Sequence, residues 1–162
     1  MALQEAILAA QYGCTIDPFT YEVDLTPATA SINTTGQFVV QSDAAFAIVQ
    51  TAVIVMSTAN AGVAGLQPFA SGVDASQLPF LVSFTDQGSG RSLQSNPVPM
   101  DSIFGDARRP YKWTTPKILE ANSTFSITVQ NLSATDRNVR MSFMGYKVFG
   151  NVGNFVAKIK NQ

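Results

Sequence analysis

The clearest structural signal lies in residues 124–149, TFSITVQNLSATDRNVRMSFMGYKVF. From Phe125 to Val129 apolar and polar residues alternate, a period of two that is typical of a half-buried β-strand. A polar segment, residues 131–138, follows, and the alternation resumes at Val139. This pattern predicts two long antiparallel strands joined by a polar turn.

The alternation in the second of these strands slips by one residue near Gly145. Before it the apolar positions are odd-numbered, up to Phe143, whereas after it they are Tyr146 and Val148. A one-residue slip beside a glycine is typical of a β-bulge. We therefore predict a bulge at Met144-Gly145.

Working outward from this pair, the rest of the chain is divided into short β-like runs by turn residues. Pro97 and Pro99 exclude a central strand over residues 96–99, because proline cannot donate to a strand ladder. The Gly- and Ala-rich residues 62–76 predict a loop, and residues 86–90 predict a hairpin-type turn. Strands are predicted at residues 19–25, 37–41, 46–56, 78–85 and 91–94.

About eight strands in one chain of 162 residues predict an all-β fold, an antiparallel β-sandwich of jelly-roll type. We expect an N-terminal arm or short helix at residues 1–18 and one β-sandwich domain at residues 19–162. Leu3, Ile7 and Leu8 have helical spacing, so this arm is a candidate for contact with a neighbour or with its own domain. The N-terminus shows no targeting signal, and no segment is apolar enough to indicate a membrane span.

Composition excludes several kinds of catalytic site. The chain has no histidine and one cysteine, which removes Ser-His-Asp and Cys-His systems, histidine-ligated metals and intramolecular disulfides. Asp101 and Asp106 are followed by Arg108-Arg109, which favours local ion pairing over acid–base catalysis. We expect no catalytic residue, no metal and no cofactor.

The charges are divided along the chain. Residues 1–90 contain seven acids and no base, whereas residues 91–162 contain ten bases and four acids. Two interpretations remain open: ordinary pairing within the chain, or an acidic patch that meets a basic patch on a neighbouring copy.

The segment Arg108-Arg109-Pro110-Tyr111-Lys112-Trp113 is the most distinctive motif. Arg, Tyr and Trp are enriched in protein–protein hot spots, and interleaved cations and aromatics also suit single-stranded nucleic acid. Packing within the domain is the third interpretation. The sequence pI of about 5.2 argues against nucleic acid.

Several segments between residues 78 and 149 together resemble small virion proteins of tailed bacteriophages. The matching pieces are Gly90–Leu93, Pro97–Gly105, Arg109-Pro110, Leu119, Asn122–Thr124, Asn131–Ser133 and Phe143–Phe149. The resemblance implies a structural component of the phage head, a cement or decoration protein with a β-sandwich or jelly-roll fold. Proteins of this kind associate as dimers or trimers and have no catalytic residues.

From the residues and this resemblance we expect a non-enzymatic virion protein that binds the major capsid protein and stabilises the shell of the phage head. The candidate interface residues are Leu3, Ile7, Leu8, Arg108, Arg109, Tyr111, Lys112 and Trp113. Two alternatives stay open. One is a tail or head–tail connector component; the other is a jelly-roll module that binds a carbohydrate or receptor through Trp113, Tyr111 and Tyr146.

Overall fold

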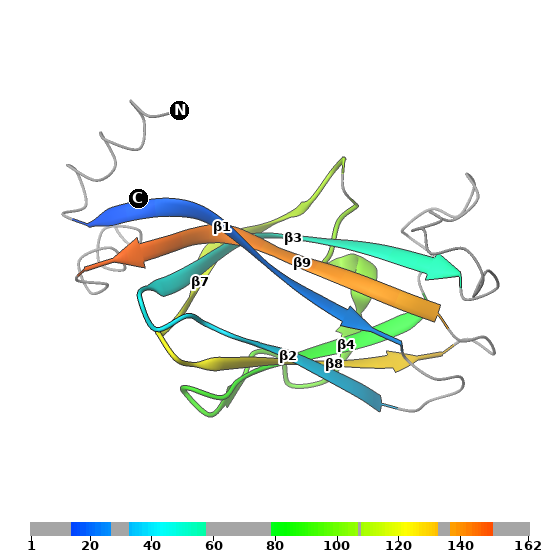
Figure 1. Ribbon diagram of the computed structural model, residues 1–162. Coiled ribbons are helices and arrows are strands. Elements are labelled where there is room, and N and C mark those ends of the chain that lie inside the picture. The colour runs from blue at the N-terminus through cyan, green and yellow to red at the C-terminus, as the bar shows by residue number, and fades with distance from the viewer. Residues whose placement is uncertain (1–13, 27–32, 58–78, 107, 133–136, 151–162) are drawn as a thin grey trace.

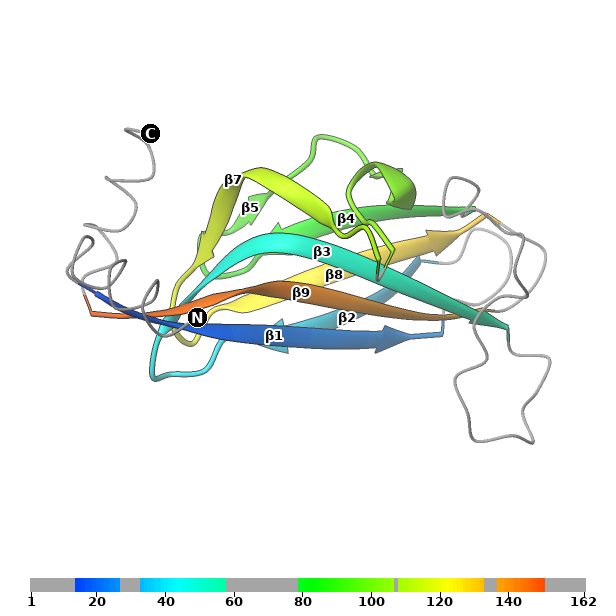
Figure 2. The same cartoon turned by 90° about the horizontal axis from the view of Figure 1, so that it is seen from above.

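The computed structural model describes residues 14–26, 33–57, 79–106, 108–132 and 137–150, which form two antiparallel β-sheets packed as a sandwich (Figures 1 and 2). The predicted all-β sandwich is therefore confirmed. The strands are β1 (Thr15–Leu25), β2 (Asn33–Val39), β3 (Ala45–Ser57), β4 (Phe80–Asp86), β5 (Arg91–Ser92), β6 (Val98–Pro99), β7 (Tyr111–Leu119), β8 (Thr124–Asn131) and β9 (Arg137–Phe149). One 3₁₀ turn, η3, spans Met100–Ser102.

The first sheet has the strand order β1-β9-β3-β7, and the second has the order β2-β8-β4-β5, with β6 also paired to β4. Successive long strands alternate between the two sheets. Seen from above, β7 and β5 lie on one side of the sandwich and β1 and β2 on the other (Figure 2). No helix among the described residues is long and apolar enough to cross a membrane.

Two strands begin earlier than their apolar residues predict. β1 begins at Thr15 rather than Phe19, because Thr15 and the residues after it pair with the end of β9, starting at Phe149. Residues 15–18, which the expected arm included, are therefore part of β1. β2 begins at Asn33 rather than Gln37, since its polar first half is an edge strand held by backbone pairing to β8.

The bulge lies at the predicted place but on the neighbouring strand. Ile48 pairs with Gly145 and Gln50 pairs with Met144, so the extra residue is Val49 in β3. β9 itself stays in regular register with β1. The prediction of a bulge within β9 was wrong, because the apparent slip reflects a buried glycine and the buried Lys147 at positions where apolar residues are usual.

Gly145 is required by this bulge. A Cβ atom there would lie 1.8 Å from the carbonyl oxygen of Ala47 and 2.8 Å from its carbon. Both are backbone atoms, so no rotamer change relieves the contact. The close approach of β3 and β9 at this point therefore depends on the absence of a side chain.

Aromatic side chains fill the space between the sheets. Phe143 of β9 lies 5.3–5.8 Å, centroid to centroid, from the rings of Phe38, Phe84, Phe104 and Phe125. Phe84, Phe125 and Phe143 are fully buried. These contacts tie β2, β4, β8, β9 and the segment after η3 into one core.

Candidate protein interface

The candidate site is an exposed basic segment, residues 108–112, here called the basic loop; its last two residues begin β7 at the edge of the first sheet. The carboxylate of Asp106 accepts hydrogen bonds from the backbone N–H groups of Arg108 at 2.7 Å and Arg109 at 2.6 Å. These bonds fold the start of the loop into a tight turn. Asp106 is thus an acceptor for backbone groups, and the local ion pair expected here is not among those of the described residues.

Thr51, a fully buried residue of β3, forms hydrogen bonds with the chain on both sides of the basic loop. Before the loop, the Thr51 hydroxyl donates to the carbonyl of Ile103, and the N–H of Gly105 donates to the Thr51 carbonyl at 3.2 Å. After the loop, the indole N–H of Trp113 donates to the Thr51 hydroxyl at 3.3 Å. One core residue therefore fixes both ends of an exposed segment.

Trp113 belongs to the core rather than to the exposed interface. Its ring stacks on Phe84 at 6.2 Å with an interplanar angle of 26°, and the side chain is half-buried. The preceding residues of the loop are different: Arg108, Arg109 and Lys112 are exposed, and Tyr111 is 37% exposed. The interpretation of this motif as packing within the domain is therefore correct for Trp113, whereas the other four side chains remain available to a partner.

The remaining predicted interface residues, Leu3, Ile7 and Leu8, lie outside the described residues. The aromatic platform considered for sugars does not form: Trp113 faces the core, whereas Tyr146 lines a hollow on the outer face of the first sheet.

The ion pairs of the described residues each join an acid from the first half of the chain to a base from the second half. They are Asp24–Arg140, Asp43–Lys147 and Asp86–Lys117, with closest N–O distances of 2.7–2.8 Å. Pairing within the chain is thus confirmed for these six residues.

These ion pairs lower the pKa values of their carboxyl groups. Hydrogen bonds from Arg140 and Lys147 lower the pKa values of Asp24 and Asp43, respectively. Burial tends to raise the pKa of Asp86, but hydrogen bonds from Lys117 and Ser89 outweigh it, so this pKa is also lowered. All three carboxylates are therefore charged at neutral pH.

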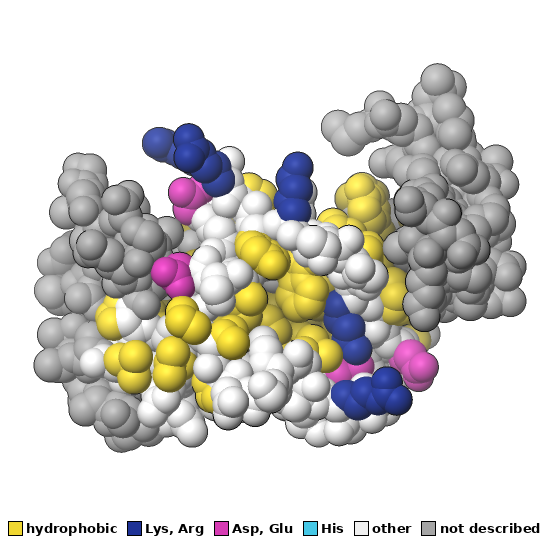
Figure 3. Space-filling view, turned by 180° about the vertical axis from the view of Figure 1, so that it is seen from behind, with side chains coloured by type: hydrophobic (Ala, Val, Ile, Leu, Met, Phe, Trp, Pro, Cys, Tyr) yellow, Lys and Arg dark blue, Asp and Glu magenta, His cyan; other side chains and the backbone are white. Residues whose placement is uncertain are grey.

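The bases of the basic loop differ from these paired bases because no carboxylate of the described residues forms an ion pair with them. Arg108, Arg109 and Lys112 take part in none of the ion pairs found in the described part of the chain, and neither does Arg91 of β5. Figure 3 shows the side of the sandwich that carries β7 and β5: basic side chains stand at its upper edge and lower right, with acidic side chains near them, around a hydrophobic centre. Among the described residues, the exposed bases on this side are therefore held in no ion pair and can contact an acidic partner.

The Gly-rich turn after β4 is not a phosphate site. Asp86 accepts hydrogen bonds from the backbone N–H groups of Gly88 at 3.1 Å and Ser89 at 3.4 Å, and from the Ser89 hydroxyl at 2.8 Å. The turn therefore uses its own carboxylate as the acceptor, and the predicted turn is confirmed. Across the described residues, no three His, Cys, Asp or Glu side chains are grouped closely enough to hold a metal ion.

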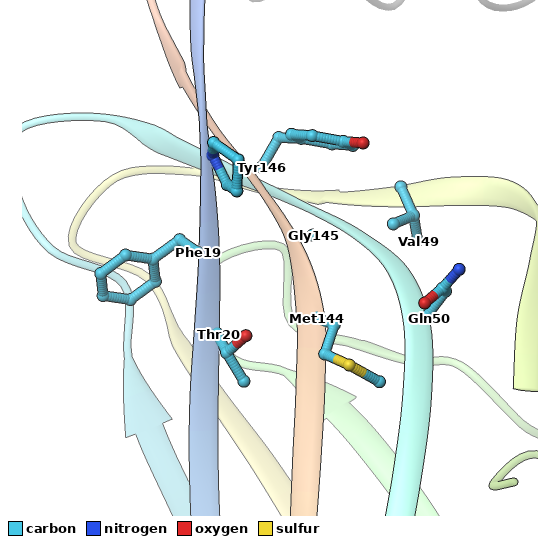
Figure 4. A pocket seen from close by; sticks show the side chains of 8 residues that line it. Phe19, Thr20, Val49, Gln50, Met144, Gly145 and Tyr146 are labelled. Carbon is cyan, nitrogen blue, oxygen red and sulfur yellow. The ribbon is translucent and has the colours of Figure 1, made fainter. Parts of the chain in front are cut away.

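A hollow lies on the outer face of the first sheet, at the bulge (Figure 4). This hollow has a volume of about 550 Å³ and is lined by Pro18, Phe19, Thr20, Val49, Gln50, Met144, Gly145 and Tyr146. Sequence reasoning missed it, because it forms where the unpaired Val49 disturbs the register of β3. The only local sign was the glycine in β9.

Comparisons of the chain with known protein families, with curated proteins and with solved structures found no match.

Proposed function

We propose that this protein is a non-enzymatic structural component of a tailed-phage virion, one that binds and stabilises the capsid shell. The observation that carries the proposal is the basic loop: an exposed, positively charged segment fixed at both ends to the buried Thr51. Its bases pair with no acid in the described residues, so they are available to an acidic surface. We propose that this acidic surface belongs to the capsid shell, because residues 78–149 resemble phage virion proteins.

The mechanism follows from mass action. A protein that contacts two adjacent shell subunits binds only the assembled state, and it stabilises that state by its binding free energy. Rigid anchoring of the loop lowers the entropy lost on binding, and complementary charge fixes the register of the contact. A dimer or trimer of this chain would add avidity without a larger patch on each copy.

The strand order supports the jelly-roll interpretation within this proposal. Successive long strands alternate between two layers, and the last long strand, β9, returns to lie beside the first. This arrangement is typical of jelly-roll sandwiches, an architecture found in viral capsid proteins.

The test is co-sedimentation of the purified protein with phage head shells that lack it. We expect saturation at many copies per shell, greater heat resistance of the shells, and weaker binding at high salt. No binding, or binding at a single vertex, would overturn the proposal in favour of a connector, tail or receptor-binding component.

A triple variant, Arg108→Ala/Arg109→Ala/Lys112→Ala, tests the basic loop itself. Exposed charge contacts contribute about 0.2–1 kcal/mol each, so removal of three should weaken binding roughly 3- to 150-fold. Arg91→Ala is the matched control, because it removes an exposed arginine from β5 and leaves the loop intact. If Arg91→Ala costs as much binding free energy per charge removed as the triple variant does, net charge rather than the loop drives binding.

A further inference from the structure

One edge strand of the second sheet, β2, has none of the features that usually protect a sheet edge. It lies at the side of the sandwich opposite β7 and β5, and among the described strands it pairs only with β8 (Figure 2). Charge, proline or short length commonly keep an edge strand from pairing with another chain. β2 is seven residues long and contains neither a charged residue nor a proline.

The other described edge strands are protected. β1 contains Pro18 and three acids, and β7 contains Pro116 and two lysines. β5 and β6 have two residues each, which is too short for an extended pairing. Among the described strands, β2 is therefore the edge best suited to pairing with another chain.

The backbone groups of β2 that point to the open edge follow from its bonding to the second sheet. The N–H of Val40, directly after β2, donates to the carbonyl of Ser123 at 2.9 Å. Backbone direction alternates along an antiparallel strand, so the even-numbered residues bond toward β8 and the odd-numbered residues point away from it. The odd-numbered residues of β2 are all exposed; they are Asn33, Thr35, Gln37 and Val39.

We propose that this edge pairs with β2 of a second copy, antiparallel about a two-fold axis at Gly36. In this register Asn33 faces the partner's Val39 and Thr35 faces the partner's Gln37, so both strands are paired along their whole length. Each of these facing pairs exchanges two backbone hydrogen bonds, which joins the second sheets of the two copies into one. The proposal concerns the isolated protein and does not depend on the function proposed above.

Charge is the reason for choosing a second copy as the occupant of this edge and of no other. In a two-fold antiparallel pair each strand meets its own sequence, so a strand with charges of one sign brings like charges together. Such pairing would place acids near acids at β1 and lysines near lysines at β7. At β2 every side chain is neutral, so self-pairing has no such cost. The partner strand would also cover part of Val39, an apolar side chain that is 53% exposed.

Sedimentation equilibrium of the isolated protein tests the pairing. We expect a monomer–dimer equilibrium within about 1–300 μM. Thr35→Lys/Gln37→Lys places lysine opposite lysine in both central pairs and should raise the dissociation constant at least about fivefold. The matched control, Ser83→Lys/Thr85→Lys, adds the same charge to β4, inside the same sheet, and should leave the dissociation constant unchanged. Urea unfolding followed by Trp113 fluorescence checks that each variant is folded.

A charge exchange tests the register. Thr35→Glu/Gln37→Glu should dimerise as weakly as the lysine variant, but an equimolar mixture of the two should form heterodimers, because each lysine then faces a glutamate.

Four results would overturn the proposal. One is a monomer at every concentration up to about 300 μM. Another is a dimer that the substitutions in β2 leave intact, which would place the interface elsewhere. The third is equal weakening by the β4 control, because net charge would then be the cause, and the fourth is a mixture that forms no heterodimer.

Discussion

Gly105→Ala should loosen the basic loop while leaving the sandwich folded. The N–H of Gly105 donates to Thr51 at 3.2 Å, and its carbonyl accepts from Val53 at 2.9 Å. An added Cβ would lie 1.9 Å from the carbonyl oxygen of Arg109, 2.5 Å from the nitrogen of Tyr111 and 2.7 Å from the carbonyl carbon of Pro110. All three are backbone atoms, so either the loop moves or the bonds to β3 break.

The size of the effect follows from these contacts. Overpacking of this kind costs about 1–3 kcal/mol, and each hydrogen bond lost costs about 0.5–1.5 kcal/mol. We therefore expect a loss of about 2–4 kcal/mol in the free energy of unfolding. For a chain of this size that lowers Tm by roughly 4–16 °C.

Urea unfolding followed by Trp113 fluorescence measures the stability, and shell co-sedimentation measures binding. Gly90→Ala is the control: its φ is +64°, and a Cβ there meets nothing within 4 Å, so only the backbone cost of about 1–2 kcal/mol remains. We expect Gly105→Ala to bind shells more weakly than Gly90→Ala does. Unchanged stability and binding in Gly105→Ala would refute the claim that this close packing holds the loop.

Three further substitutions test the framework around the site. Gly145→Ala places a Cβ 1.8 Å from the Ala47 carbonyl oxygen and should destabilise the protein by about 3 kcal/mol; a urea midpoint equal to wild type would contradict the bulge geometry. Thr51→Val keeps the side-chain shape but leaves the Ile103 carbonyl and the Trp113 indole N–H without their bonds, at about 1–3 kcal/mol, measurable as faster proteolysis near residues 103–113. Asp86→Asn tests the pH dependence: the folded pKa of Asp86 is below its ordinary value of 3.8, so its stabilisation is present above about pH 4 and is lost as pH falls through the folded pKa. The stability gap between wild type and Asp86→Asn should therefore shrink from pH 6 to pH 2, and a constant gap would rule out this ion pair as the cause.

Strict alternation made the strands on either side of the last turn predictable, because each buries one face. In β8 the buried residues Phe125, Ile127 and Val129 are the apolar ones, so pattern and structure coincide. The end of β9 was less predictable. Lys147 is buried there because its ammonium group bonds to Asp43 at 2.8 Å and lies 4.6 Å from the centre of the Phe19 ring. A lysine at a buried position reverses the apparent alternation, which no pattern of apolar residues reveals.

The candidate interface shows a different limit of sequence reasoning. Arg, Tyr and Trp are enriched in protein interfaces, but Trp also stacks within cores, and the composition of residues 108–113 is the same in both cases. The bond from Trp113 to Thr51 joins residues 62 positions apart, so it depends on the pairing of β3 with β7. Only the fold shows that Trp113 packs against the core while the side chains before it are exposed.

The topology also explains why the basic loop forms no ion pair with the acidic half of the chain. Every strand pairing joins a strand ending by Asp86 to a strand starting at Arg91 or later. A chain that is acidic in its first half and basic in its second therefore places opposite charges on neighbouring strands, as Asp24 of β1 beside Arg140 of β9 shows. Among the described strands β7 pairs only with β3, and β3 contains no acid over Ala45–Ser57. Strand pairing therefore brings no acid to the basic loop, whose bases form none of the ion pairs of the described residues, and this is the physical reason for expecting an acidic partner at that edge.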